Sequence, residues 1–161
     1  MIVKMRIDDR LLHGQIAYSW RAALSYDAIV IASDDVANDD VRKSIIKMAT
    51  PTGVRLAVRS ISEAAKLLNN DKLKSLKVFV IVGNPKDAYN LYQLIDERPC
   101  LNIGGMAKAE GKVLFSKAVF VSKQDISYLD KIDQSSIEME VRQVPSESVK
   151  EFKSLRKKIE F

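Results

Sequence analysis

The chain has 161 residues, 47 % of them hydrophobic, a formal charge of +5 and an isoelectric point near 9.3. This size and composition suit one buried core, so we expect residues 1–161 to form a single domain. The lone Cys100 excludes an intramolecular disulfide and no apolar run is long enough to span a bilayer, so we expect a cytoplasmic protein that reaches membranes only through a partner.

The first part of the chain predicts a strand, a helix and a second strand. Residues 2–7 are rich in β-branched side chains, and residues 28–32 are a continuous apolar run of the kind found in buried strands. Between them, apolar residues recur every three or four positions from Gly14, which predicts a helix ending near Ser25. Trp20 lies on the apolar face of this helix, so we interpret it as a packing residue.

A second helix and a third strand are expected next. The helix is predicted from four apolar residues at helical spacing, which we assign to its buried face: Val41, Ile45, Met48 and Ala49. Pro51 and Gly53 end this helix, and residues 54–58 form the strand. Asp34 and Asp35 have no further metal-ligating residues nearby, so we interpret them as loop or helix-capping residues and expect no metal site.

The same alternation continues in the middle of the chain. Ser60 and Glu63 have the spacing of a capping box, in which each side chain satisfies a backbone amide at the start of a helix. Residues 78–82 are the clearest strand. Asn84 and Pro85 are typical of the cap and first position of the helix that follows.

The last third predicts shorter elements. We expect strands at 101–103 and 118–121, and we interpret Gly104–Gly105 as a tight turn. After another helix, residues 137–144 alternate like a half-exposed strand. Pro145–Ser146 begins a final helix, whose predicted inner face is Val149, Phe152, Leu155 and Ile159.

Basic side chains are concentrated in this expected final helix: Lys150, Lys153, Arg156, Lys157 and Lys158. No aromatic residues interleave with them to stack bases, so we interpret them as a solvated helix face and expect no nucleic-acid partner. Strands that alternate with helices pair in parallel through right-handed crossovers. The predicted fold is therefore a three-layer α/β/α architecture with a mainly parallel central sheet of about seven strands and helices on both faces.

The only histidine, His13, lies between the first expected strand and the first expected helix. Ligands of such sheets gather at the carboxyl ends of the strands, and a helix N-terminus offers free amides to an anion. These features suit a phosphoryl group on His13, with the amides of Gly14 and Gln15 receiving its oxygens. Arg6 and Arg10 flank the histidine and supply guanidinium groups that match phosphate oxygens.

Several alternatives stay open at this level. We assign Asp9 as the residue that orients the imidazole, although Asp8 can do the same. In a purely structural interpretation, His13 caps a helix and both arginines pair with these aspartates. Other function classes are a non-catalytic module that binds an anionic ligand or nucleotide, and a phosphatase, for which no separate base is found.

The segment 6–15 (RIDDRLLHGQ), followed by Trp20, resembles the active-site signature of the mannose/fructose/sorbose-type IIB components of the bacterial phosphoenolpyruvate-dependent sugar phosphotransferase system. The resemblance continues through residues 34–39, 47–51 and 102–106. It implies that His13 carries the phosphate, on Nδ1, and that Arg6 and Arg10 are the arginines of an R-x-D-x-R pattern.

This resemblance also implies an activity and partners. Such a component is a transferase that accepts phosphate from a phosphohistidine on a IIA domain and passes it to a sugar bound by membrane IIC and IID subunits, to which it associates peripherally. It needs no metal or organic cofactor, and an exposed sheet edge can support a homo-oligomer. The sugar stays open among mannose, fructose, sorbose and amino sugars. Candidate residues of a second phosphate-contacting loop are Ser60, Gly83, Asn84 and Lys86.

Overall fold

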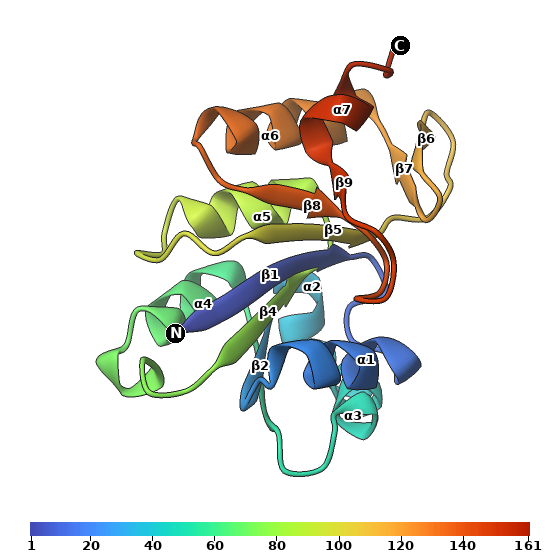
Figure 1. The fold of residues 1–161 in the computed structure, drawn as a ribbon. Coiled ribbons are helices and arrows are strands. Elements are labelled where there is room, and N and C mark those ends of the chain that lie inside the picture. Colours follow the sequence, from blue (N-terminus) through green and yellow to red (C-terminus); the bar gives the residue numbers. More distant parts are fainter.

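A seven-stranded sheet forms the centre of the structure, a computed structural model that describes residues 1–161 (Figure 1). The strand order is β3-β2-β4-β1-β5-β8-β9, and every neighbouring pair is parallel except β8 and β9. The strands are β1 (Ile2–Asp8), β2 (Ala28–Ala32), β3 (Arg55–Arg59), β4 (Val78–Val82), β5 (Leu101–Gly105), β8 (Met139–Val141) and β9 (Lys150–Glu151). A separate antiparallel hairpin consists of β6 (Val113–Ser116) and β7 (Val119–Val121).

Helices cover both faces of this sheet, which confirms the predicted three-layer architecture. They are α1 (Gly14–Leu24), α2 (Asp34–Ala37), α3 (Asp40–Ala49), α4 (Ile61–Leu68), α5 (Pro85–Tyr92), α6 (Lys123–Gln134) and α7 (Phe152–Arg156), with a 3-10 turn at Asp71–Leu73. The larger apolar core joins one face to α4, α5, α6 and α7, and the smaller core joins the other face to α1, α2 and α3.

The inner strand β4 shows why the strands of this sheet can be predicted from the sequence. Val78, Val80 and Val82 belong to the larger core, whereas Phe79 and Ile81 point to the opposite face and belong to the smaller core. Because both faces of a central parallel strand are covered by helices, its sequence is a continuous apolar run.

Local capping signals hold where they were predicted. The Asn84 side chain accepts a hydrogen bond from the Asp87 amide at 2.8 Å, with Pro85 in the first turn of α5. Ser60 accepts one from the Glu63 amide at 3.3 Å, so half of the expected capping box forms. Ser25 ends α1 in a left-handed conformation.

The C-terminal third differs from the prediction. Instead of a half-exposed strand at 137–144, β8 is short and fully buried, because β5 and β9 pair with its two edges. The expected helix start at Pro145–Ser146 is also wrong. Residues 142–149 form a loop, in which Arg142 donates to the Pro145 carbonyl at 2.8 Å. The chain then returns as β9 before α7 begins, and Val149 is exposed rather than inward-facing.

Two other expectations about this region change. The strand expected at 118–121 exists as β7, but it pairs with β6 in the hairpin and not with the main sheet. Gly104–Gly105 is not a tight turn, since both residues extend β5 along β1, where Asp8 pairs with Gly105.

The helix α3 lies on the sheet with a different face from the one predicted. Val41, Ile45 and Met48 are 70, 59 and 87 % exposed, and only Ile46 is buried, at 5 %. Helical periodicity identifies an amphipathic helix but does not say whether solvent, the core or another molecule covers its apolar face. In this chain Val41, Ile45 and Met48 face outward, whereas Ala49 packs against the smaller core as predicted.

This assignment predicts opposite responses to truncation on the two faces of α3. We expect Ile46→Ala to lower the free energy of unfolding by about 2–4 kcal/mol, because it leaves a cavity in the smaller core. We expect Val41→Ala or Met48→Ala to change it by less than about 0.5 kcal/mol. Urea denaturation measures all three, and a large loss in Met48→Ala would contradict the exposed face.

Candidate functional site

The loop from β1 to α1 lies where the strand connections of the sheet diverge. From β1 the chain crosses toward β2, whereas from β5 it proceeds to β8 on the other side. Ligand sites in such sheets form at the carboxyl ends of two strands of this kind. The loop is held there by Asp9, whose amide donates to the Gly105 carbonyl at 3.0 Å and whose Oδ2 accepts from the Ala107 amide at 2.6 Å.

The loop itself is a tight, anchored turn. The Asp8 carboxylate accepts from the Arg10 amide at 3.0 Å, and the Asp8 carbonyl accepts from the Leu11 amide at 2.9 Å. Leu11 has φ +57°, a left-handed conformation that costs a non-glycine residue about 1–2 kcal/mol. Burial of the Leu11 and Leu12 side chains offsets this cost and fixes the backbone that leads into His13.

His13 occupies the N-cap position of α1, with its side chain 20 % exposed. Its Nε2 lies 3.1 Å from Oδ2 of Asp8. A carboxylate accepts hydrogen bonds, so the proton of the neutral imidazole belongs on Nε2 and the lone pair on Nδ1. The amides of Gly14 and Gln15 follow at the helix N-terminus, where backbone donors have no partner within the helix.

The structure decides between the two aspartates that the sequence left open. Asp8 contacts the imidazole, whereas Asp9 turns to the Ala107 amide, so the assignment of Asp9 as the orienting residue is wrong. The reason is strand alternation. Asp8 is the last residue of β1 and points to the α1 side of the sheet, and Asp9 already lies outside the strand.

Arg6 lies two residues before Asp8 on the same face of β1, and its side chain is 0 % exposed. Its Nη2 donates to Oδ2 of Asp8 at 2.9 Å, and its Nη1 donates to Asn102 Oδ1 at 2.7 Å and to the Gln143 carbonyl at 2.9 Å. Burial lowers the pKa of the guanidinium, although the Asp8 carboxylate opposes this effect. The predicted direct contact of Arg6 with phosphate does not fit this placement, because its donors are already used and shielded from solvent.

The two glycines of β5 leave room for this ion pair. A Cβ atom built on Gly104 would lie 2.1 Å from Cζ of Arg6, and one on Gly105 would lie 3.4 Å from the Asp8 carboxylate. Side chains at Gly104 are therefore excluded by the packing of the guanidinium against the strand backbone.

A buried polar network continues behind Arg6 on the same face of the sheet. Lys4 and Arg142 both pair with the Glu140 carboxylate, and Asn102 donates to the Arg142 carbonyl at 3.1 Å. Burial raises the pKa of Glu140, but these two cations outweigh that effect and leave it lowered. None of the predicted sites includes this network, although its sequence signal is present in β1, where the charged residues Lys4, Arg6 and Asp8 occupy alternate positions.

Trp20 of α1 packs against this polar network. The guanidinium groups of Arg6 and Arg142 lie 5.7 and 5.3 Å from its ring centroid, and its Nε1 donates to the Gln143 carbonyl at 3.2 Å. Its full burial confirms the predicted packing role, and cation–π contacts add to it.

Arg10 is exposed beside His13, as a phosphate-contacting residue must be. Both residues line a hollow of about 240 Å³ that also reaches α3. Its lining is Arg10, Leu11, Leu12, His13, Arg42, Ile45 and Ile46. The arrangement thus brings His13, Arg10, Gly14 and Gln15 together at one surface, with Arg6 behind it.

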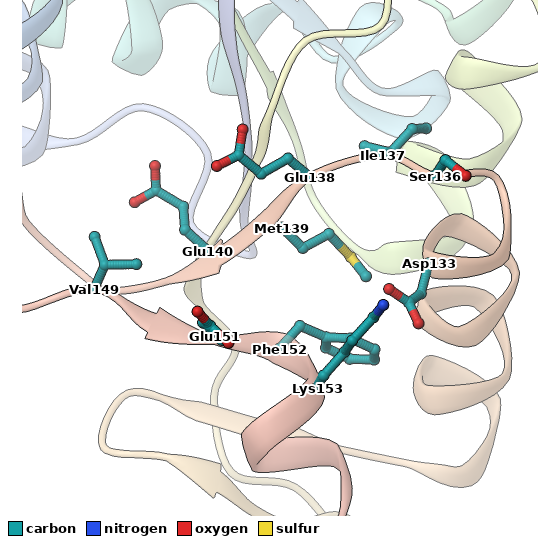
Figure 2. A pocket seen from close by; sticks show the side chains of 10 residues that line it. All are labelled: Asp133, Ser136, Ile137, Glu138, Met139, Glu140, Val149, Glu151, Phe152 and Lys153. Carbon is teal, nitrogen blue, oxygen red and sulfur yellow. The ribbon is translucent and has the colours of Figure 1, made fainter.

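Three larger hollows lie elsewhere and contain no histidine. One of about 470 Å³ is formed by the end of α6, β8, β9 and α7 (Figure 2). Another of about 610 Å³ includes Asn84 and Lys86, while Gly83 lies within van der Waals reach of Leu11. Of the candidate residues for a second phosphate-contacting loop, Gly83 thus lies next to the loop of His13, whereas Asn84 and Lys86 line a different hollow.

No cluster of side chains in the structure is suited to hold a metal ion. None of its helices combines the length and apolarity needed to cross a bilayer.

Comparisons with known proteins identify the family of the chain and bear out its fold. Residues 2–161 match the family model of the PTS system sorbose subfamily IIB component. The chain is 35 % identical over 146 residues to the sorbose-specific EIIB component of Klebsiella pneumoniae, covering 91 % of this chain and 89 % of that protein. It is 35 % identical over 155 residues to the mannose-specific EIIAB component of Escherichia coli K12, covering 96 % of this chain and 48 % of that longer protein. The crystal structure of the IIBSor domain of the sorbose permease from Klebsiella pneumoniae superimposes with a TM-score of 0.94 at 32 % identity, covering 100 and 99 % of the two chains.

The close approach of Gly104 to Arg6 predicts a strong effect of one methyl group. We expect Gly104→Ala to displace the guanidinium and to lower the free energy of unfolding by about 1–3 kcal/mol. In the control Gly83→Ala, the nearest atom is 3.7 Å from the new Cβ, so stability should change by less than about 0.5 kcal/mol. Thermal and urea unfolding compare the two, and equal stability would argue against the packing described here.

The contact between Asp8 and His13 predicts the tautomer of the imidazole. We expect 15N NMR of histidine-labelled protein to show the neutral ring protonated on Nε2, and the chain has one histidine, so the signal is unambiguous. Asp8→Asn should yield a mixture of tautomers, whereas Asp9→Asn should leave the spectrum unchanged. A neutral ring protonated mainly on Nδ1 in the unaltered protein would refute the assignment.

Proposed function

Because the chain belongs to the sorbose subfamily of the IIB components of the sugar phosphotransferase system, we propose that it carries a phosphoryl group on Nδ1 of His13. The phosphate arrives from a phosphohistidine on a IIA domain and leaves to a sugar held by membrane IIC and IID subunits. The observation that carries this proposal is the 3.1 Å contact of Nε2 with Asp8, which leaves Nδ1 as the free nucleophile.

The charges of the site support the first transfer. The Nδ1 lone pair attacks phosphorus while the nitrogen–phosphorus bond of the donor breaks, and the donor imidazole departs with that electron pair. His13 keeps its Nε2 proton, so its ring becomes positively charged. The Asp8 carboxylate faces that proton and stabilises the cation, and Arg6 holds the carboxylate in place.

The same arrangement supports the second transfer. When the sugar hydroxyl attacks phosphorus, the bond from phosphorus to Nδ1 breaks, the ring that retains its Nε2 proton leaves as neutral imidazole, and the hydroxyl proton is released to water, so Asp8 keeps the phosphoryl bond reactive. In this proposal the phosphoryl oxygens are received by exposed Arg10 and by the amides of Gly14 and Gln15 at the helix N-terminus.

We assign the protein to the cytoplasm, peripherally associated with its membrane subunits. The choice of sugar belongs to those subunits in this proposal, since the hollow beside His13 is small and open to the partner. Its relatives are specific for sorbose and mannose, which leaves several hexoses as substrates.

The test is reconstitution of the phosphate relay. Protein mixed with phosphoenolpyruvate, the relay kinase, the general phosphocarrier and a IIA partner should gain one acid-labile phosphate, and 31P NMR should place it on Nδ1. His13→Ala should abolish labelling completely. Labelling of that variant, or none of the unaltered protein, would refute the proposal.

A further inference from the structure

The outward face of α3 carries an apolar ridge that nothing in the chain covers. Val41, Ile45 and Met48 follow one another at helical spacing and are 70, 59 and 87 % exposed. Ile46 attaches the helix to the smaller core from its other side. Contiguous exposed apolar side chains of this kind mark interaction sites more often than single exposed residues do.

The ridge is continuous with the phosphate site. Ile45 and Arg42 of α3 line the same hollow as His13 and Arg10, which places the start of α3 beside the imidazole. For phosphorus to pass between two imidazoles, the donor must bring its own histidine to this hollow. A protein surface that does so meets α3 as well.

We propose that the ridge of Val41, Ile45 and Met48, together with Arg42, is the docking surface for the phosphorylated IIA domain. This inference rests on the proposed function. The apolar ridge supplies buried area, and Arg42 supplies a second exposed guanidinium at the hollow, a role that buried Arg6 cannot fill.

Charge favours the donor over the membrane acceptor as the occupant. Arg10 and Arg42 form no salt bridge within the chain, so the hollow is cationic before phosphate arrives. The donor approaches with the doubly charged phosphoryl group, which these guanidinium groups attract. The acceptor sugar is neutral and meets the site only after the phosphate on His13 has offset that charge.

A second copy of the chain fits this surface less well. A stable dimer built on α3 would cover the hollow that contains His13 and block both transfers. The surface must instead be free between encounters, as a transient docking site is.

The test uses the triple variant Val41→Ser, Ile45→Ser, Met48→Ser. These side chains are exposed, so folding should be preserved, which circular dichroism verifies. We expect the KM for phosphorylated IIA to rise about 10-fold or more, with labelling of His13 still complete at saturating donor. The matched control is Leu114→Ser, since Leu114 is 60 % exposed on the distant β6 and should leave KM unchanged.

Arg42→Gln tests the electrostatic part of the surface. We expect KM for the donor to rise several-fold and its dependence on salt to become shallower than in the unaltered protein. An unchanged salt dependence would remove Arg42 from the docking surface.

The outcomes separate this inference from the proposed function. If the unaltered protein is not labelled at all, the proposed function fails. If the unaltered protein is labelled and the triple variant keeps the same KM for phosphorylated IIA, the docking inference is refuted and the proposed function stands. The docking proposal is also overturned if the variant loses only transfer to sugar in membranes with IIC and IID, or if gel filtration shows a dimer that the variant dissociates.

Discussion

The ion pair between Arg6 and Asp8 is the interaction on which the site depends. Both side chains are buried, and a buried charge without its partner costs several kcal/mol, so neither can leave without disturbing the other. Asp8 uses the same oxygen, Oδ2, for Arg6 and for His13, and its second oxygen holds the loop through the Arg10 amide. One carboxylate therefore fixes the ring, the turn and the arginine together.

Much of the fold could be predicted from the sequence because the strands at its centre are covered on both faces. Continuous apolar runs such as 28–32 and 78–82 leave no alternative to a buried parallel strand. Which face of α3 packs on the sheet could not be predicted, since an apolar stripe does not say whether the core, solvent or another molecule covers it. The segment 142–149 was misread because β9 depends on pairing with β8, a contact that local sequence does not encode.

In the site, too, some features follow from neighbouring residues in the sequence, and others depend on contacts between distant segments. His13 and Arg10 follow from a strand, a turn and a helix start that are all local. The burial of Arg6 required knowledge of the residue on β5 that its guanidinium packs against, since a side chain at Gly104 would occupy that space. Strand alternation places Arg6 and Asp8 on one side of β1, and applied to the sequence it would have favoured Asp8 over the Asp9 that we assigned.

The carbonyl of Gln143 accepts hydrogen bonds from Arg6 of β1 and from the Trp20 indole of α1, so the surroundings of His13 include a residue 137 positions after Arg6. During synthesis on the ribosome, the segment with His13 emerges before Gln143, which helps to hold it in place. A nascent chain therefore exposes the loop of His13 without this support until residue 143 has been made.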